Sequence, residues 1–312
     1  MPEMVGDMEV EVLSVDRLHF ADGSPVRSAS AVVPFGDGVL VVSDDAVRAA
    51  WLHEETVTPV RLLAPIGGYE LFDETSGTKH LKPDFEAACQ VTVDGSPAAM
   101  VLGSGSSPAR MLWSLLRLRG SEPVAVVADM SDVYSAVAEA LLVGADFLNL
   151  EGACTVGGVL RWYHRGLPSA GLPSASVDVD LTTALAATLG QGDAANVTVS
   201  NPRYYDLGAV DGVGLAVTDV AALPGGVLLA SAAAEDSPNP RDDGPVVASA
   251  LARLEDDLVV QVVPLPDLDG RVIKVEGLMV LETDERETLL LAVADEDNPE
   301  VASVATRIRV RH

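Results

Sequence analysis

The sequence predicts an all-β fold, a single five-bladed β-propeller domain over residues 1–312, and three observations carry this prediction. Short runs of Val, Leu and Ala occur in pairs around turn residues. Polar residues recur at the openings of these pairs about every sixty residues. The two ends of the chain have the pattern of complementary strands. Strand-rich units repeated at such a period are typical of a propeller.

Each pair of apolar runs predicts a β-hairpin, because two strand-length segments flank a turn signal. The five pairs are Ala31–Val33 with Val39–Val42, Phe85–Val93 with Ala98–Leu102, Ala153–Val156 with Val159–Tyr163, Leu215–Leu223 with Val227–Ala233, and Gly277–Leu281 with Leu289–Val293.

A small or acidic residue opens the first strand of each hairpin. The five openings are Ser30-Ala31, Glu86-Ala87, Glu151-Gly152, Asp219-Val220 and Glu276-Gly277. They are separated by steps of 56, 65, 68 and 57 residues. Such long-period recurrence is not expected of a β-sandwich. Six blades remain an alternative, because residues 172–205 have room for strands that belong to none of these hairpins.

One helix is predicted over Asp132–Val143, in a connection between two repeats. Val133, Val137 and Leu141 recur at helical spacing. Ser131 is expected to cap this helix, which we place at the periphery of the fold.

The chain ends predict how the ring closes. Met8–Val15 and Ser303–Arg311 both alternate polar and apolar residues, the first with acidic and the second with basic side chains. Opposite charges favour pairing across a ladder. We expect the two segments to pair in the last blade, which would hide two exposed sheet edges.

Composition excludes several functions. The 312 residues include 20 Lys and Arg against 47 Asp and Glu, a formal charge of −27. This balance argues against binding to nucleic acid or to an anionic membrane. The sequence has no recognisable secretion signal and no apolar run of roughly 18 residues. A cytoplasmic location is expected, with Cys89 and Cys154 as free buried thiols.

The acidic openings predict a site. Residues at the ends of innermost strands face the channel mouth, so Glu86, Glu151, Asp219 and Glu276 should converge there. Carboxylates this close repel one another unless a cation offsets them. One candidate is Ca²⁺, which prefers oxygen ligands and would be held by Glu86, Glu151 and Glu276. The same three glutamates are candidate catalytic groups.

Basic residues near these openings are the other candidate partners. Lys82 and Lys274, two of only three lysines, lie within four residues of an opening glutamate. We expect them to act in catalysis, and Arg110 and Arg165 to bind substrate. The alternatives are that these pairs only neutralise buried charge, or that the acids hold a structural metal.

Two further features are candidate substrate contacts. Ser104 and Ser106 lie in the turn Gly103–Ser107, which is either an anion-binding nest or a tight hairpin turn. Glu235 ends an apolar strand and should lie at the top of its blade. It also begins an acidic loop, residues 235–244, that offers oxygen ligands for Ca²⁺.

These motifs together resemble an uncharacterised bacterial propeller family of unknown function, over residues 25–305. The motifs are Lys82–Glu86, Gly103–Ser107, Asn149–Ala153, Arg165-Gly166, Ala234–Asp236, Asp242–Gly244, Lys274–Gly277 and Asp295–Asp297. More distantly, the Glu-Gly openings resemble those of the esterase-like phytase domain and of calcium-dependent propeller lactonases. Asp219-Val220 departs from the Glu-Gly pattern.

The distant resemblance implies a metal-bearing funnel that acts on an ester, lactone or phosphoester. The other interpretation is a non-catalytic propeller that binds an anionic or sugar-like metabolite or a protein partner. A fold of this kind hosts many functions, so the choice depends on the site.

Overall fold

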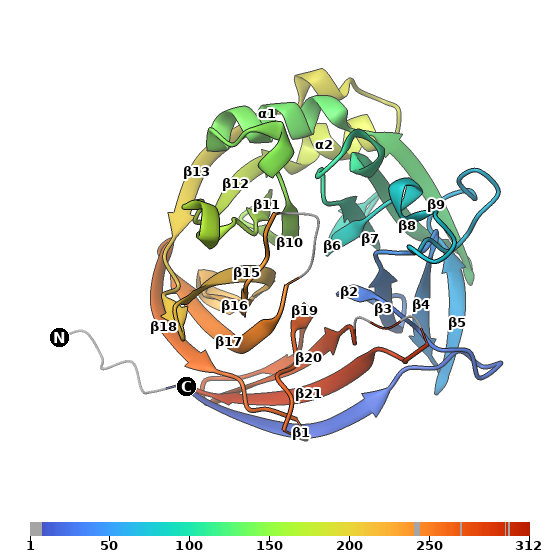
Figure 1. The fold of residues 1–312 in the computed structure, drawn as a ribbon. Coiled ribbons are helices and arrows are strands. Elements are labelled where there is room, and N and C mark those ends of the chain that lie inside the picture. Colours follow the sequence, from blue (N-terminus) through green and yellow to red (C-terminus); the bar gives the residue numbers. More distant parts are fainter. Residues whose placement is uncertain (1–7, 240–243, 269, 297, 299) are drawn as a thin grey trace.

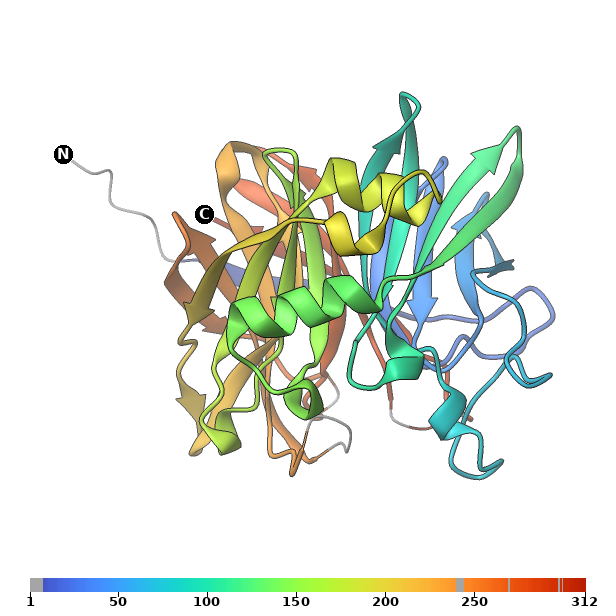
Figure 2. The same cartoon turned by 90° about the horizontal axis from the view of Figure 1, so that it is seen from above.

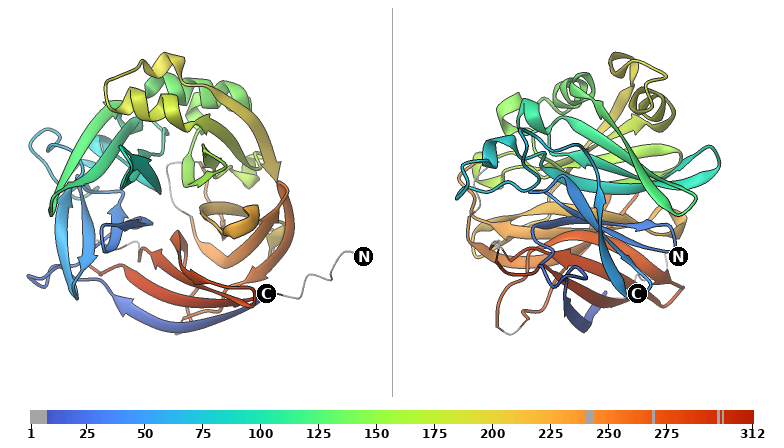
Figure 3. Two further views of the ribbon diagram at one scale, coloured as in Figure 1. Left: turned by 180° about the vertical axis from the view of Figure 1, so that it is seen from behind. Right: turned by 90° about the vertical axis from the view of Figure 1, so that its right-hand side faces the viewer.

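Five antiparallel sheets surround a central axis in the computed structural model, which describes residues 8–239, 244–268, 270–296, 298 and 300–312 (Figure 1). The ring is visible from both faces (Figure 3). The prediction of a five-bladed propeller is confirmed.

The blades follow one another along the chain. From the axis outward, blade 1 consists of β2 (Ala29–Phe35), β3 (Gly38–Ser43), β4 (Arg48–His53) and β5 (Thr56–Arg61). Blade 2 consists of β6 (Phe85–Val93), β7 (Ser96–Gly103), β8 (Leu112–Arg119) and β9 (Glu122–Asp129). Blade 3 consists of β10 (Leu150–Val156), β11 (Val159–His164), β12 (Ser174–Asp180) and β13 (Val199–Tyr205).

Blade 4 has an additional short strand beside its innermost long one. It consists of β14 (Ala209–Val210), β15 (Val213–Ala222), β16 (Leu228–Glu235), β17 (Val246–Glu255) and β18 (Leu258–Pro264). Blade 5 consists of β19 (Val275–Thr283), β20 (Glu287–Ala294), β21 (Val304–Arg311) and β1 (Glu9–Arg17). The five predicted hairpins are therefore the two inner long strands of each blade.

The chain ends close the ring as predicted. Strand β1 pairs antiparallel with β21, with Glu9 opposite Arg311 and Glu11 opposite Arg309. Oε2 of Glu11 lies 3.1 Å from Nη1 of Arg309 and 2.9 Å from Nη2 of Arg311. The outer edge of blade 5 thus comes from the opposite end of the chain to its other three strands.

Two helices lie on the outer side of the ring, over blades 2 and 3 (Figure 2). Helix α1 (Ser131–Leu141) buries Tyr134, whose ring lies 4.9 Å from that of Trp162. Its peripheral position was predicted, but its cap was not. Ser131 is the first helical residue, and its backbone N–H donates to Asp129 Oδ1 at 2.9 Å.

Helix α2 (Leu181–Thr188) lies between β12 and β13. Residues 172–205 therefore supply the two outer strands of blade 3 and no sixth blade. Short 3₁₀ turns occupy Lys79–Leu81, Pro108–Arg110, Ala145–Phe147, Pro168–Ala170, Ala194–Asn196 and Pro224–Gly226.

Every innermost long strand carries a β-bulge, near its beginning in four blades and in the middle of β15 in blade 4. The bulges lie between Ala29 and Ala31, Phe85 and Ala87, Glu151 and Ala153, Val217 and Asp219, and Val275 and Gly277. A bulge adds one unpaired residue and re-aims the side chains around it. The polar openings of the sequence repeat therefore coincide with the places where the inner strands bend.

The glycine of the Glu-Gly openings has a packing cause. A Cβ on Gly152 would lie 2.7 Å from Cα of Asp219, and one on Gly277 would lie 2.8 Å from Cα of Ala31. Both contacts are with the backbone of a neighbouring inner strand. The narrow ring thus leaves no room for a side chain at these two positions.

Candidate functional site

A cavity of about 430 Å³ opens at the end of the channel where the inner strands begin. Its wall contains nine carboxylates and five basic side chains. The charged residues of the wall are Asp44, Asp45, Asp73, Glu74, Lys79, Lys82, Asp84, Glu86, Arg110, Glu151, Arg165, Lys274, Glu276 and Asp295. The expected convergence of Glu86, Glu151 and Glu276 at one funnel is therefore present, together with all four expected basic partners.

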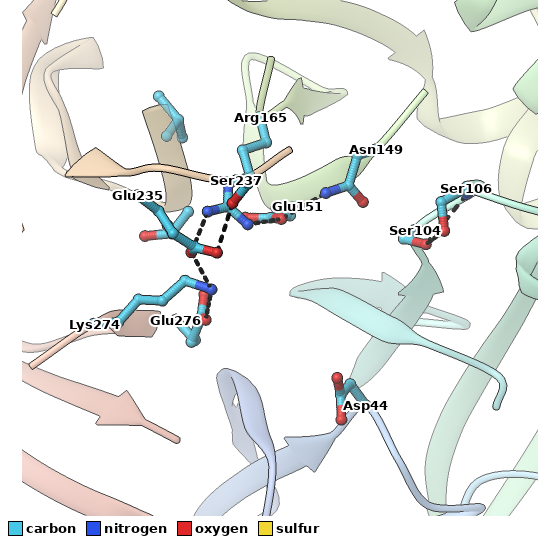
Figure 4. A network of polar contacts seen from close by, with 12 residues as sticks. Asp44, Ser104, Ser106, Asn149, Glu151, Arg165, Glu235, Ser237, Lys274 and Glu276 are labelled. Atoms are coloured by element: carbon cyan, nitrogen blue, oxygen red, sulfur yellow. Dashed lines mark hydrogen bonds and ion pairs between the residues drawn. The ribbon is translucent and has the colours of Figure 1, made fainter. Parts of the chain in front are cut away.

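One side of the funnel is a chain of buried ion pairs, here called the Glu235 cluster (Figure 4). Glu235 Oε2 lies 2.6 Å from Nη2 of Arg165 and 2.8 Å from Nζ of Lys274. Arg165 Nη1 lies 3.2 Å from Oε1 of Glu151, and Lys274 Nζ lies 2.7 Å from Oε1 of Glu276. These five residues connect blades 3, 4 and 5.

The other side is the Asp84 cluster, which connects blades 1 and 2. The Lys82 ammonium bonds to Asp44 and lies 2.8 Å from Oδ1 of Asp84. Arg110 Nη1 lies 2.8 Å from Oδ2 of Asp84. Glu86 completes the cluster, with no hydrogen bond or ion pair to any described residue. In Figure 4, Asp44 lies across the cavity from the Glu235 cluster.

The pKa values in the Glu235 cluster diverge. Burial alone would raise the pKa of Glu235, but Arg165 and Lys274 outweigh it and hold this pKa well below its usual range. Burial raises the pKa of Glu151 to about 7, against the opposing charge of Arg165. Burial also raises the pKa of Glu276. One carboxylate is therefore fixed as an anion while its neighbours titrate at higher pH.

The same division occurs in the Asp84 cluster. Burial raises the pKa of Glu86 well above its usual range, and the charges of Asp44 and Asp84 add to this effect. Burial opposes ionisation of Asp84, but Lys82 and Arg110 lower its pKa. Each cluster thus pairs a fixed carboxylate with a carboxyl that retains its proton more readily.

The serine-rich turn positions Asp84. Ser104 and Ser106 both bond through their hydroxyls to Asp84 Oδ2, the second at 3.3 Å. The backbone N–H groups of Ser104 and Gly105 donate to the carbonyls of Asp84 and Arg110, at 2.8 and 3.0 Å. This segment belongs to the connection between β7, which ends at Gly103, and β8, which begins at Leu112, so it is longer than a tight hairpin turn. The anion-binding alternative stays a prediction. Neither serine lines the cavity, and a direct contact of either with a ligand stays a prediction.

Asp219 does not belong to the ring of funnel acids, which corrects the alignment of the fourth opening. Its Oδ2 accepts the backbone N–H of Leu278 at 2.6 Å, and the residue is buried away from the cavity. Thr218 occupies the bulge and donates to the carbonyl of Val275 at 2.6 Å. Ser30 makes the same contact to Phe85 at 2.5 Å. Thr218, one residue before Asp219, is therefore the residue of blade 4 that is equivalent to Ser30 in blade 1.

Sequence reasoning also missed Asp44, Asp84 and Asn149 as site residues. Asp44 lies in the polar cluster that ends the first hairpin, and Asp84 lies inside the motif Lys82–Glu86. Asn149 lines the cavity, and its Nδ2 donates to Glu151 Oε1 at 2.9 Å. One sequence signal could have found Asp44. The end of one inner hairpin lies at the same edge of the ring as the beginning of the next, so polar residues at both places should meet.

The carboxylates that approach most closely differ from the predicted metal ligands. Asp44, Asp84 and Glu86 each present an oxygen within 4.8 Å of the others. An all-oxygen set of this kind suits Ca²⁺, but the Lys82 ammonium already contacts two of its members. The expected site on Glu86, Glu151 and Glu276 stays a prediction. Residues 240–243 of the acidic loop lie outside the described residues, as do Asp297 and Pro299.

The fold and its charged funnel define a β-propeller with a polar cavity at one end of its axis. The chain belongs to a family of unknown function (DUF6910), whose sequence profile matches residues 78–299. The expected membership of an uncharacterised propeller family is confirmed. No curated protein matches the chain.

Two solved structures are similar to the chain at low identity. Glutaminyl cyclase from Myxococcus xanthus is 11% identical, with a TM-score of 0.50 over 96% of this chain and 97% of that one. A mannose phosphorylase from Leishmania mexicana is 11% identical, with a TM-score of 0.48 over 96% and 88%. At this identity the first supports the fold and says nothing of the reaction.

Cys89 and Cys154 are free and buried, as expected. Neither described helix has the length and apolar character that crossing a membrane requires. The cytoplasmic location itself stays a prediction.

Proposed function

We propose that the funnel is the active site of a hydrolase that acts on a small ester, lactone or phosphoester. The observation that carries the proposal is Glu151, a buried carboxyl on the cavity wall whose pKa is raised to about 7. A group that titrates near the working pH can accept and return a proton efficiently. Arg165, 3.2 Å away, is a fixed positive charge beside it.

The proposed reaction uses residues from both sides of the funnel. Glu151 takes a proton from water as the water oxygen bonds to the acyl carbon or phosphorus. Arg165 and Lys274 stabilise the negative charge that develops on the substrate oxygen. The bond to the leaving oxygen then breaks, and protonated Glu86 gives that oxygen its proton. Exchange with solvent restores both carboxyls.

The remaining predicted catalytic groups support these two. Glu276 holds the Lys274 ammonium at 2.7 Å, and Lys82 holds Asp84 at 2.8 Å. In the proposal, Arg110 orients the substrate from the Asp84 side. Glu235 fixes Arg165 and Lys274 toward the cavity, because its carboxylate contacts both.

Calcium belongs to an alternative form of the proposal, in which the ion would polarise the substrate oxygen and Glu86 would be an ionised ligand in place of the proton donor. Its ligands would be the predicted Glu86, Glu151 and Glu276, or the closer set of Asp44, Asp84 and Glu86. In the second case the ion would have to displace Lys82, whose ammonium contacts Asp44 and Asp84.

An activity screen tests the proposal. Aryl esters, lactones and phosphoesters would be incubated with the protein from pH 5 to 9, with EDTA or with added Ca²⁺. We expect turnover of one class, and a loss of roughly 100-fold or more in Glu151→Gln. Glu122→Gln, at an exposed glutamate on β9, is the matched control. Absence of turnover across the panel, or full activity in folded Glu151→Gln, would contradict the proposal.

A second candidate is a propeller that binds an anionic or sugar-like metabolite, or a protein partner, without catalysis. It is favoured by the way in which Lys82, Arg165 and Lys274 each already contact two carboxylates. Cations held in this manner neutralise buried charge as readily as they assist a reaction. A ligand that raises the melting temperature without being consumed would favour this candidate. Under either function, we place the protein in the cytoplasm.

A further inference from the structure

We infer that the ligand of the funnel enters with a positively charged amine. The inference rests on the proposed function only where the ligand is called a substrate, because binding of the amine can be measured without any reaction. It also narrows the substrate class, from any ester, lactone or phosphoester to one that bears an ammonium group.

The charge balance of the wall disfavours an anion. Nine carboxylates line the cavity against five basic side chains. The central basic groups are covered: Lys274 by two glutamates, Arg165 by two glutamates and Lys82 by two aspartates. Lys79, nearer the surface, pairs with Glu74 at 2.9 Å. An anion would therefore have to displace a carboxylate before it met Lys82, Arg165 or Lys274. Arg110 contacts one carboxylate, Asp84, through its Nη1 at 2.8 Å.

Unpartnered carboxyl oxygens point to a ligand that donates hydrogen bonds. Glu86 makes no hydrogen bond or ion pair to a described residue. Oε2 of Glu151 and Oδ1 of Asp44 are buried and likewise lack a hydrogen-bond partner there. Glu151 is only 5% exposed. The two buried oxygens come from blades 1 and 3, and a buried acceptor without a donor is unfavourable. Glu86, of blade 2, is partly exposed.

The same funnel already binds two ammonium groups in this way. Lys274 Nζ lies 2.8 Å from Glu235 and 2.7 Å from Glu276. Lys82 lies between Asp44 and Asp84. An ammonium has three donors and no acceptor, so a third such group on a ligand would satisfy oxygens that no side chain satisfies. A cavity of about 430 Å³ has room for a small molecule that carries it.

The test uses 1,4-diaminobutane as the probe, by calorimetry and thermal shift at about 0.15 M salt, a concentration that screens the acidic surface. We expect it to raise the melting temperature and to give a measurable binding isotherm. We expect Glu86→Gln to weaken binding by roughly tenfold. Asp44→Asn is the second variant if Glu86→Gln does not fold, and Glu122→Gln is the control.

Parallel arms contain phosphate, sorbitol or calcium chloride in place of the diamine. The inference is overturned if phosphate or sorbitol binds and the diamine does not, or if calcium binds alone. It is also overturned if no probe binds, or if Glu86→Gln and Glu122→Gln bind the diamine equally, since the contact would then be with the general acidic surface.

These results separate the inference from the proposed function. Amine binding without hydrolysis of any substrate would leave the inference standing and remove the hydrolase. Hydrolysis of a neutral ester, with no binding of the diamine, would support the hydrolase and overturn the inference.

Discussion

Arg165 Nη2 lies 2.6 Å from Oε2 of Glu235, and this contact joins blade 3 to blade 4 at the wall of the funnel. Both side chains are largely buried, with 13% and 2% exposure. Lys274 of blade 5 contacts the same carboxylate oxygen at 2.8 Å. One glutamate therefore carries an electrostatic connection between three blades, in a fold whose neighbouring blades otherwise meet mainly through apolar side chains.

Replacing Glu235 should destabilise the fold. In Glu235→Gln the cations of Arg165 and Lys274 lose their shared anion, and breaking a buried pair costs about 3 kcal/mol. The pKa of Glu235 is lowered in the folded state, so its contribution is present above its ordinary value of 4.5 and is lost as the pH falls below it. Urea unfolding from pH 7 down to pH 3 measures this. Equal stability of Glu235→Gln and Glu122→Gln at pH 7 would contradict it.

Glu151 should give the opposite pH dependence. Its pKa is raised from 4.5 to about 7 in the folded state, so the folded protein binds the extra proton between these values. Stability should therefore fall as pH rises through this interval, by at most roughly 3 kcal/mol from this group. In Glu151→Gln the fall should be smaller. Parallel pH profiles for wild type and variant would mean that Glu151 ionises normally in the fold.

Gly277 should tolerate no side chain. In Gly277→Ala the new Cβ would lie 2.8 Å from Cα of Ala31, on the neighbouring inner strand. Overpacking of this kind costs about 1–3 kcal/mol. Gly144→Ala is the control, because the nearest atom to its new Cβ is 3.8 Å away, in Phe147. Chemical unfolding of both variants measures the difference, and equal stability would show that the ring can widen freely.

Removal of Lys82 should create or strengthen a calcium site. Asp44, Asp84 and Glu86 each present an oxygen within 4.8 Å of the others, and the Lys82 ammonium contacts two of them. In Lys82→Ala the repulsion among these acids loses its counter-charge. We expect this variant to bind Ca²⁺ at least about tenfold more tightly than the wild type, by calorimetry. Equal affinity would place any calcium site elsewhere in the chain.

Much of the fold was predictable because each inner hairpin is local in sequence. Turn residues and apolar runs define a hairpin without knowledge of the rest of the chain. Helix α2 was not predicted, since its residues Leu181–Thr188 are mostly Ala, Leu and Thr without a clear polar face. The sixth-blade alternative arose from the same stretch, where the outer strands of blade 3 are interrupted by that helix.

The site was predictable only in part. Glu86 and Glu276 occupy the bulge of their inner strands, and Glu151 lies one residue before the bulge of its own. Their recurrence in the sequence nevertheless predicted one end of the ring for all three. The prediction that Asp219 faces the funnel was wrong because a bulge adds one residue to a strand, and sequence spacing does not show which residue is added. Asp44 was missed because it meets Lys82 only after blades 1 and 2 pack together, which no local pattern reports.

The closure of blade 5 should depend on backbone pairing far more than on its ion pairs. Glu11 is 48% exposed where it contacts Arg309 and Arg311, so Glu11→Gln should cost less than about 1 kcal/mol. A variant that lacks residues 1–17 loses all of β1 and leaves β21 as an open edge, which favours association between chains. We expect a large fall in melting temperature and concentration-dependent aggregation by light scattering. A monomeric truncated protein with unchanged melting temperature would show that β1 does not hold the ring closed.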